Sequence, residues 1–245
     1  MDHYSDRFYM DILSGSRKSA EIVLPLVFSG IKPKSVVDIG CGSGAWLSIA
    51  KGNGVSDVLG LDGDYARGSL LIKPNEFKAV DISKGFLLGK RYDLALCLEV
   101  GEHIKISRAP TLVNSLTDAS DVILFSAAIP GQGGQHHINK QWPDFWKRLF
   151  LNNGYVCFDC IRPKIYTNPE VEWWYRQNIF LYVNGNALKK FPCLKANPDQ
   201  ASDVFLLHKS LLRKRYGLVR SLLYYVKFPM AYLLDKIGFR IGGRQ

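Results

Sequence analysis

The stretch SVVDIGCGSGAWLSIA, residues 35–50, decides the fold. It opens with a short β-branched run that is typical of a buried parallel strand. A glycine loop, CGSG, follows the strand and leads into an apolar segment with helical character. Glycines in such a loop let the chain turn sharply and let a ligand approach the backbone at the strand end. The stretch therefore predicts a strand–loop–helix unit built to hold a ligand; the alternative is a purely structural turn.

Further strands and helices alternate along the chain on the C-terminal side of this stretch. Alternation of this kind predicts a parallel α/β sheet with right-handed crossovers. We expect a Rossmann-like sheet of seven mostly parallel strands with helices on both faces, an antiparallel last strand and a basic helical C-terminal extension. The strands are expected at residues 35–40, 57–62, 77–82, 92–99, 121–129, 155–161 and 178–184, and helices at 19–31, 45–52, 104–119, 142–154 and 170–177.

The length of 245 residues suits one domain with a substantial extension. We expect a helical lead-in over residues 1–34, a core over 35–185, and a linker with a basic helical extension over 186–245. Residues 204–245 hold nine Lys or Arg and one acid, so this tail carries +8 of the net charge of +10. An anionic partner is therefore expected to meet the tail.

Composition also bears on the compartment. The first ten residues contain no apolar run, which predicts that there is no signal peptide. The five cysteines are odd in number, which favours a reducing, cytoplasmic setting. Charges interrupt the apolar runs of the tail, so we expect it to lie at a surface and not to span a bilayer. Three hypotheses stay open for the tail: packing on the body or on a second subunit of a homodimer, peripheral contact with anionic lipid at the inner face of a membrane, and nucleic-acid binding.

A cluster of acids and histidines follows the fourth predicted strand. Glu99, Glu102 and His103 have the spacing i, i+3 and i+4, which places them on one face of a helix if a helix begins here. His136 and His137 lie in the loop after the fifth strand, at the same edge of the sheet. This mixed oxygen and nitrogen set suits Mg²⁺, Mn²⁺, Fe²⁺ or Zn²⁺. The alternative is an exposed helix start, where acids are favoured by the helix dipole, with solvated loop histidines.

The segment VVDIGCGSGAW, residues 36–46, resembles the first motif of the class I S-adenosylmethionine (SAM) dependent methyltransferases. Four motifs of that family occur in order over residues 35–185. The resemblance implies that Asp62 binds the ribose hydroxyls, that Asp81 reads the adenine amino group and that Ile82 lines the adenine pocket. The full set of implied cofactor-binding residues is Asp38, Gly40, Cys41, Gly42, Gly44, Trp46, Asp62, Asp81, Ile82 and Leu98.

The pattern E-x-x-E-H with a later histidine resembles a metal-dependent subgroup that includes small-RNA 3′-end 2′-O-methyltransferases and some ubiquinone-pathway O-methyltransferases. The resemblance implies a divalent metal, Mg²⁺ or Mn²⁺, that grips hydroxyls of the acceptor. A bound cation makes a hydroxyl a better nucleophile by stabilising its alkoxide. The implied metal ligands are Glu99, Glu102, His103 and His137, and the implied catalytic residues are His103, His136 and His137, with His136 as a candidate general base.

Residues 125–146 and 162–178 resemble methyltransferases encoded with bacterial surface-polysaccharide pathways. This resemblance implies O-methylation of a sugar hydroxyl in a glycan or glycolipid intermediate. The candidate substrate residues are Asn139, Gln141, Trp142, Trp173 and Trp174. Three alternatives stay open: an RNA ribose 2′-O-methyltransferase, a small-molecule methyltransferase acting on quinones or catechols, and a non-catalytic, membrane-associated subunit.

Overall fold

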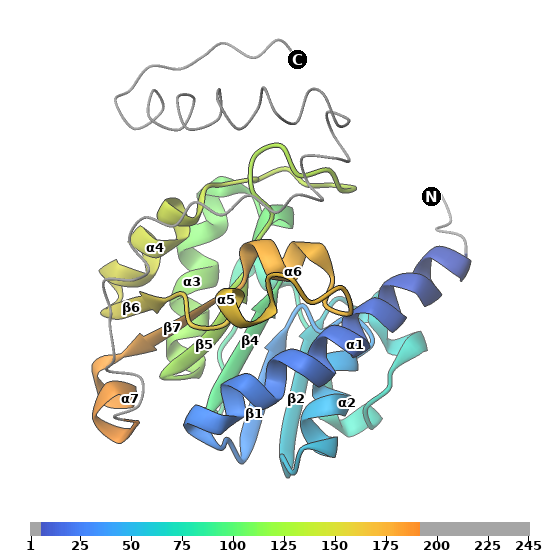
Figure 1. Cartoon of the computed structure of the whole chain (residues 1–245), viewed down its shortest axis with the longest axis horizontal. Helices are drawn as coiled ribbons and strands as arrows, with labels where there is room; N and C mark the ends of the chain where they lie inside the picture. The colour runs from blue at the N-terminus through green and yellow to red at the C-terminus, as the bar shows by residue number, and fades with distance from the viewer. Residues whose placement is uncertain (1–5, 192–245) are drawn as a thin grey trace. The chain divides into compact units, whose positions relative to one another are not determined.

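The computed structural model describes residues 6–191, and of these the side chains from residue 14 onward. Seven strands form one sheet in the order β3-β2-β1-β4-β5-β7-β6 (Figure 1). All neighbouring strands are parallel except that β7 is antiparallel to both β5 and β6. The predicted fold is confirmed. The strands are β1 Ser35–Ile39, β2 Asp57–Asp62, β3 Phe77–Ala79, β4 Leu94–Leu98, β5 Val122–Ser126, β6 Tyr155–Phe158 and β7 Phe180–Asn184.

The two central strands explain why the apolar runs in the sequence are nearly continuous. Every residue of β4 and β5 is buried, because helices cover both faces of the sheet there. The chain leaves β3 at one edge and returns to β4 beside β1, so the strand order reverses between β1 and β4. Ligands of open α/β sheets bind at such a reversal, beyond the carboxyl ends of the strands.

The helices form one layer on each face of the sheet (Figure 1). One apolar cluster joins the sheet to α1, α2, α5, α6 and α7, and a second joins its other face to α3 and α4. Together the layers make a three-layer α/β/α sandwich. The helices are α1 Asp6–Ile31, α2 Ala45–Gly52, α3 Ala109–Ala119, α4 Pro143–Asn152, α5 Arg162–Ile165, α6 Trp173–Asn178 and α7 Gly185–Lys190.

Two helix boundaries differ from the sequence-based expectation. Helix α1 begins at Asp6, thirteen residues before the predicted start at residue 19, and it continues through Pro25, whose side chain is exposed. The helix expected over 104–119 begins only at Ala109, after two single 3₁₀ turns. Pro110 explains the later start, because proline is favoured in the first turn of a helix, where its missing N–H breaks no bond.

Within residues 6–191 no helix combines the length and the apolar character needed to cross a bilayer. The predicted basic extension falls almost wholly outside the described residues. Its contacts with a membrane, a second subunit or the body therefore stay predictions, as does the domain boundary at residue 185.

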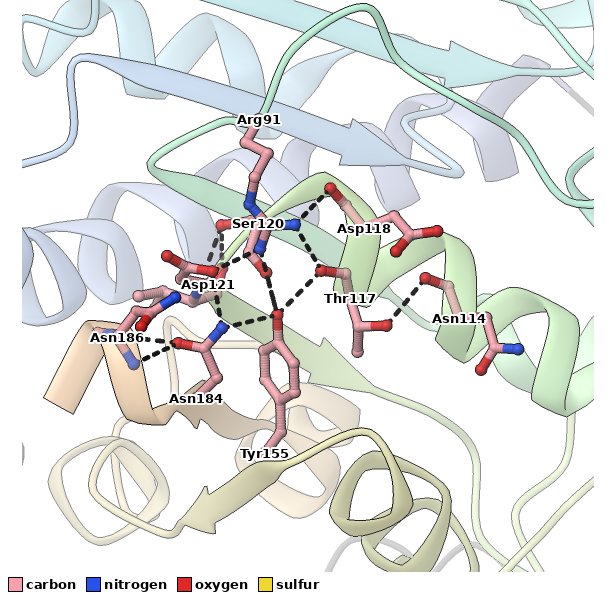
Figure 2. A network of polar contacts seen from close by, with 11 residues as sticks. Arg91, Asn114, Thr117, Asp118, Ser120, Asp121, Tyr155, Asn184 and Asn186 are labelled. Atoms are coloured by element: carbon pink, nitrogen blue, oxygen red, sulfur yellow. Dashed lines mark hydrogen bonds and ion pairs between the residues drawn. The ribbon is translucent and has the colours of Figure 1, made fainter.

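A polar network closes the edge of the sheet opposite to the carboxyl ends of the parallel strands (Figure 2). The Tyr155 hydroxyl donates to the carbonyl oxygens of Ser120 and Thr117, at 2.6 and 3.0 Å. The carbonyl of Thr117 lies in the last turn of α3, where it has no partner within the helix. Arg91 reaches the same helix end and pairs with Asp121. The network therefore ties the end of α3 to β5 and β6.

We expect Tyr155→Phe to lower the free energy of unfolding by ~1–3 kcal/mol, because it leaves the buried carbonyl group of Ser120 without its donor, whereas the Thr117 carbonyl keeps the hydrogen bond from Arg91. Urea denaturation measures this change. Tyr92→Phe is the matched control, since Tyr92 is also buried and its hydroxyl makes no hydrogen bond with the described residues. Equal effects of the two substitutions would show that the network contributes nothing beyond the packing of the rings.

Candidate active site

The glycine loop connects β1 to α2 at the carboxyl edge of the sheet. Gly40, Gly42 and Gly44 have φ angles of 77°, 53° and 78°, which side-chain-bearing residues rarely adopt. A Cβ atom on Gly40 would also lie 2.3 Å from a methyl carbon of Val100. The positive φ angles explain why glycine occurs at these three positions. A Cβ atom on Gly42 would meet no other atom within 4 Å, so the backbone there has free space beside it.

Asp62 ends β2 and joins the loops that follow β1 and β2. Its carboxylate accepts hydrogen bonds from the backbone N–H groups of Gly42 and Gly63, both at 2.7 Å. The Tyr65 hydroxyl donates to the same carboxylate. The side chain is thus held by backbone donors at the strand end, where a carboxylate is able to accept the two hydroxyls of a ribose.

Asp38 lies beneath the glycine loop in β1 and is almost fully buried. Burial, and secondarily repulsion from Asp62, raises the pKa of Asp38 to about 8. A cationic ligand beside Asp38 would favour the ionised form of its carboxyl group. The pair therefore gives this end of the loop a preference for positive charge.

The other predicted cofactor residues occupy less uniform positions. Asp81 is exposed after β3, where it accepts hydrogen bonds from Ser83 and pairs with Lys84 at 3.3 Å. Trp46 is buried, and its indole N–H donates to the Tyr175 hydroxyl at 3.4 Å, so this ring packs in the core. Three further members of the set are buried near the carboxyl edge, namely Cys41, Ile82 and Leu98. Their roles toward a cofactor stay predictions.

Glu102, His103 and His137 lie together in the structure, and each offers a ligand atom within 4.8 Å of the others. The two imidazole rings meet edge to face with their centres 4.9 Å apart. Nε2 of His137 lies 3.9 Å from Oε1 of Glu102, whose side chain is fully buried. Residues from two loops thus converge on one point.

Backbone contacts hold these two loops against each other. The N–H groups of Ile138 and Asn139 both donate to the carbonyl oxygen of Glu102 at 2.9 Å. The side-chain amide of Asn139 donates to the carbonyl of Gly101 at 3.2 Å. A Cβ atom at Gly134 would lie 2.1 Å from the His137 ring, so only glycine leaves room for the imidazole.

The polar atoms of this group suit a divalent cation. Both carboxylate oxygens of Glu102 and Nδ1 of His137 are buried without a hydrogen-bond partner among the described residues. Burial, and then repulsion from Glu99, raises the pKa of Glu102 well above its usual range. Burial lowers the pKa of His137 to about 4 and also lowers that of His103, so both imidazoles offer free lone pairs at neutral pH. A cation would satisfy the buried oxygens and meet two neutral nitrogen donors.

Glu99 is placed differently from the other three predicted ligands. It has a φ of 56° directly after β4, so the helix that would align it with Glu102 and His103 does not begin here. Its carboxylate accepts hydrogen bonds from the amides of Gln132 and Asn178, at 3.0 and 3.1 Å. Neither of these two amides was among the site residues predicted from the sequence. Their only common signal is burial of a polar side chain, which is visible once the fold is known.

The remaining candidate residues lie in the loop after β5, directly before α4 and at the start of α6. His136 is exposed and has a φ of 55°. Asn139 is buried and accepts a hydrogen bond from Gln141 at 3.0 Å, so both residues help to hold the loop. Trp142 is half-buried directly before α4. Trp173 and Trp174 are half-buried and meet edge to face at 5.8 Å.

Comparison with known families agrees with this fold. Residues 9–178 match the family described as "Methyltransferase domain". The chain therefore belongs to this family, and its sheet order and glycine loop make it a class I SAM-dependent methyltransferase. The resemblance seen in the sequence is confirmed at this level, whereas the metal-dependent subgroup stays a prediction.

Solved structures show the same fold at low sequence identity. The sugar N-methyltransferase KedS8 from Streptoalloteichus sp. ATCC 53650 is 14% identical, with a TM-score of 0.57 over 75% of this chain and 94% of that chain. The SAM-bound amino pentose methyltransferase CalS10 from Micromonospora echinaspora is 14% identical, with a TM-score of 0.53 over 75% and 99%. SAM-bound magnesium protoporphyrin IX methyltransferase from Synechocystis PCC 6803 is 20% identical, with a TM-score of 0.52 over 76% and 87%. No curated protein matches the sequence significantly.

Proposed function

We propose that this methyltransferase transfers the methyl group of SAM to a hydroxyl group of a sugar in a glycan or glycolipid, with the help of Mg²⁺ or Mn²⁺. The observation that carries the proposal is the convergence of Glu102, His103 and His137. The carboxylate oxygens of Glu102 and Nδ1 of His137 are buried there and have no hydrogen-bond partner in the described part of the chain. This group lies after β4 and β5, next to the reversal in strand order, which is the acceptor side of the glycine loop.

The cofactor side of the proposal rests on the glycine loop and Asp62. The loop backbone would receive the methionine part of SAM, and the Asp62 carboxylate would accept the ribose hydroxyls. Asp38 and Asp62 together favour a ligand that carries positive charge, as the sulfonium and ammonium groups of SAM do. Two of the structural neighbours, CalS10 and the protoporphyrin methyltransferase, contain bound SAM.

On the acceptor side, Glu102, His103 and His137 would hold the metal. When bound, the metal would stabilise the alkoxide form of the acceptor hydroxyl and so make it a nucleophile. His136 is exposed beside this group and is the candidate to receive the hydroxyl proton. The protein would then place the oxygen in line with the methyl group, which accounts for much of the rate enhancement in a displacement of this type.

The proposal of a sugar acceptor has two supports. Residues 125–146 and 162–178 resemble methyltransferases of bacterial polysaccharide pathways. KedS8 and CalS10, which share the fold, are sugar and amino pentose methyltransferases. KedS8 methylates nitrogen, so the choice between oxygen and nitrogen has to be tested directly.

The test is the transfer of radiolabelled methyl groups from SAM to a panel of nucleotide-activated sugars, oligosaccharides and lipid-linked sugars. We expect the label in an alkali-stable methyl ether formed at a sugar hydroxyl group, which mass spectrometry would identify. EDTA should abolish the transfer, and Mg²⁺ or Mn²⁺ should restore it. Label on an amine, or transfer that proceeds at full rate in EDTA, would contradict the corresponding part of the proposal.

A further inference from the structure

The two short segments that supply His103 and His137 to the candidate metal group have a similar composition. Residues 103–108 have the sequence HIKISR and residues 136–140 have HHINK, so each joins histidine to isoleucine and lysine. We call these segments the rim. Because the N–H groups of Ile138 and Asn139 both bond to the Glu102 carbonyl, the two segments lie side by side.

The rim exposes two large aliphatic side chains. Ile106 is 54% exposed and Ile138 is 61% exposed, although each has polar neighbours in its segment. In the described part of the chain six large apolar residues are strongly exposed, and Ile106 and Ile138 are two of them. Exposure of apolar side chains to water is unfavourable, and their position beside a binding site indicates a contact with an apolar phase.

The rim also carries positive charge only. Lys105 and Arg108 are exposed and Lys140 is partly exposed, and neither segment contains an acid. Within residues 6–191 none of these three side chains forms an ion pair. The cations are therefore available to an external anionic partner.

We infer that the rim docks on an anionic phospholipid membrane. Isoleucine side chains would enter the boundary between headgroups and acyl chains while the neighbouring lysines and arginine meet lipid phosphates, as in other interfacial segments. A single-stranded nucleic acid would instead be expected to stack on exposed Phe, Tyr or Trp rings, and the rim contains none of these residues. This surface is formed by core residues and does not include residues 204–245 of the basic tail.

One consequence rests on the proposed function. If Glu102, His103 and His137 hold the metal that activates the acceptor, docking of the rim would bring this group to the level of the lipid headgroups. The acceptor class that fits this placement is a sugar attached to a membrane lipid. A soluble sugar would gain nothing from the exposed isoleucines.

The test is flotation of the full-length protein with phosphatidylcholine vesicles that contain or lack phosphatidylglycerol. We expect partition into the phosphatidylglycerol vesicles, and a decrease of roughly tenfold or more in the partition coefficient of the Ile106→Ser/Ile138→Ser double variant. Lys105→Gln/Lys140→Gln should weaken binding by a similar factor and reduce its dependence on salt. Leu151→Ser and Lys164→Gln are matched controls, because Leu151 is 60% exposed on α4 and Lys164 is exposed on α5.

Calorimetric titration with SAM checks that every variant is folded, since the rim lies outside the glycine loop. Partition of both double variants equal to that of the wild type would overturn the inference and assign any membrane contact to another segment. Failure of the wild type to float would overturn it as well. Vesicle binding is measured without methyl transfer, so loss of the metal-dependent activity would reject the proposed function and leave the docking surface standing.

Discussion

The Glu102→Gln variant should lose methyl transfer by ~100-fold or more while its affinity for SAM stays that of the wild type. Glutamine keeps the size of the side chain but removes the carboxylate that a bound cation would hold in its ionised form, at a fully buried position whose oxygens have no hydrogen-bond partner within residues 6–191. Replacing a residue that hydrogen-bonds to a metal ligand typically lowers metal affinity or activity by ~10–100-fold. Replacing a ligand itself should lower them by at least the upper end of that range. SAM affinity should be unaffected, because the glycine loop and Asp62 belong to the segments at the ends of β1 and β2, whereas Glu102 follows β4.

Titration of the metal-free protein with Mn²⁺, followed by initial rates at saturating SAM, measures this effect. Glu170→Gln is the matched control, since Glu170 is exposed in the loop before α6.

A second pair of variants tests the position of the His137 ring without changing any of the proposed metal ligands. Gly134→Ala should weaken Mn²⁺ binding because its Cβ would displace the His137 ring, whereas Gly133→Ala has open space around it. Wild-type Mn²⁺ affinity in both Glu102→Gln and Gly134→Ala would show that the group holds no metal.

The sheet was predictable from sequence because burial on both faces requires strands that are apolar along their whole length. The run Leu94–Leu98 is one example, and it occupies the centre of the sheet. A helical lead-in was expected over residues 1–34, but apolar periodicity did not predict where α1 begins within it. Residues 6–18 mix charged, aromatic and glycine residues, and helix formation there has no continuous apolar stripe to indicate it.

The site residues were predictable only where they are adjacent in sequence or follow neighbouring strands at the same edge of the sheet. Glu102 and His103 are adjacent in sequence, and the loop with His137 follows a strand at the same edge, so their convergence follows from the topology. The conformation of Glu99 did not follow from spacing, since its backbone turns away from a helical path. Gln132 and Asn178 reach Glu99 from 33 and 79 residues away, a contact that depends on the full packing of the sheet and α6.

Asp62→Ala should weaken SAM binding by ~10–150-fold, which corresponds to about 1.5–3 kcal/mol for loss of hydrogen bonds to a charged group. The carboxylate has two functions in this structure, because it holds the Gly42 and Gly63 backbones and would accept the ribose hydroxyls. Isothermal calorimetry with SAM measures the loss. Asp64→Asn is the control, since Asp64 is exposed and pairs only with Arg67 among the ion pairs of the described residues. Unchanged affinity in Asp62→Ala would remove this carboxylate from the cofactor site.

Tyr65→Phe separates the two functions of Asp62. The Tyr65 hydroxyl donates to Oδ1 of Asp62, and a ribose hydroxyl bound to that atom would have to displace it. Tyr65 is 81% exposed, so loss of its hydroxyl group disturbs little of the packing around the ring. If Asp62 binds the ribose, Tyr65→Phe should bind SAM as tightly as the wild type or more tightly, because no competing donor has to leave. If Asp62 only fixes the two loops, Tyr65→Phe should weaken SAM binding in the same direction as Asp62→Ala, since one of the tethers to that carboxylate is lost.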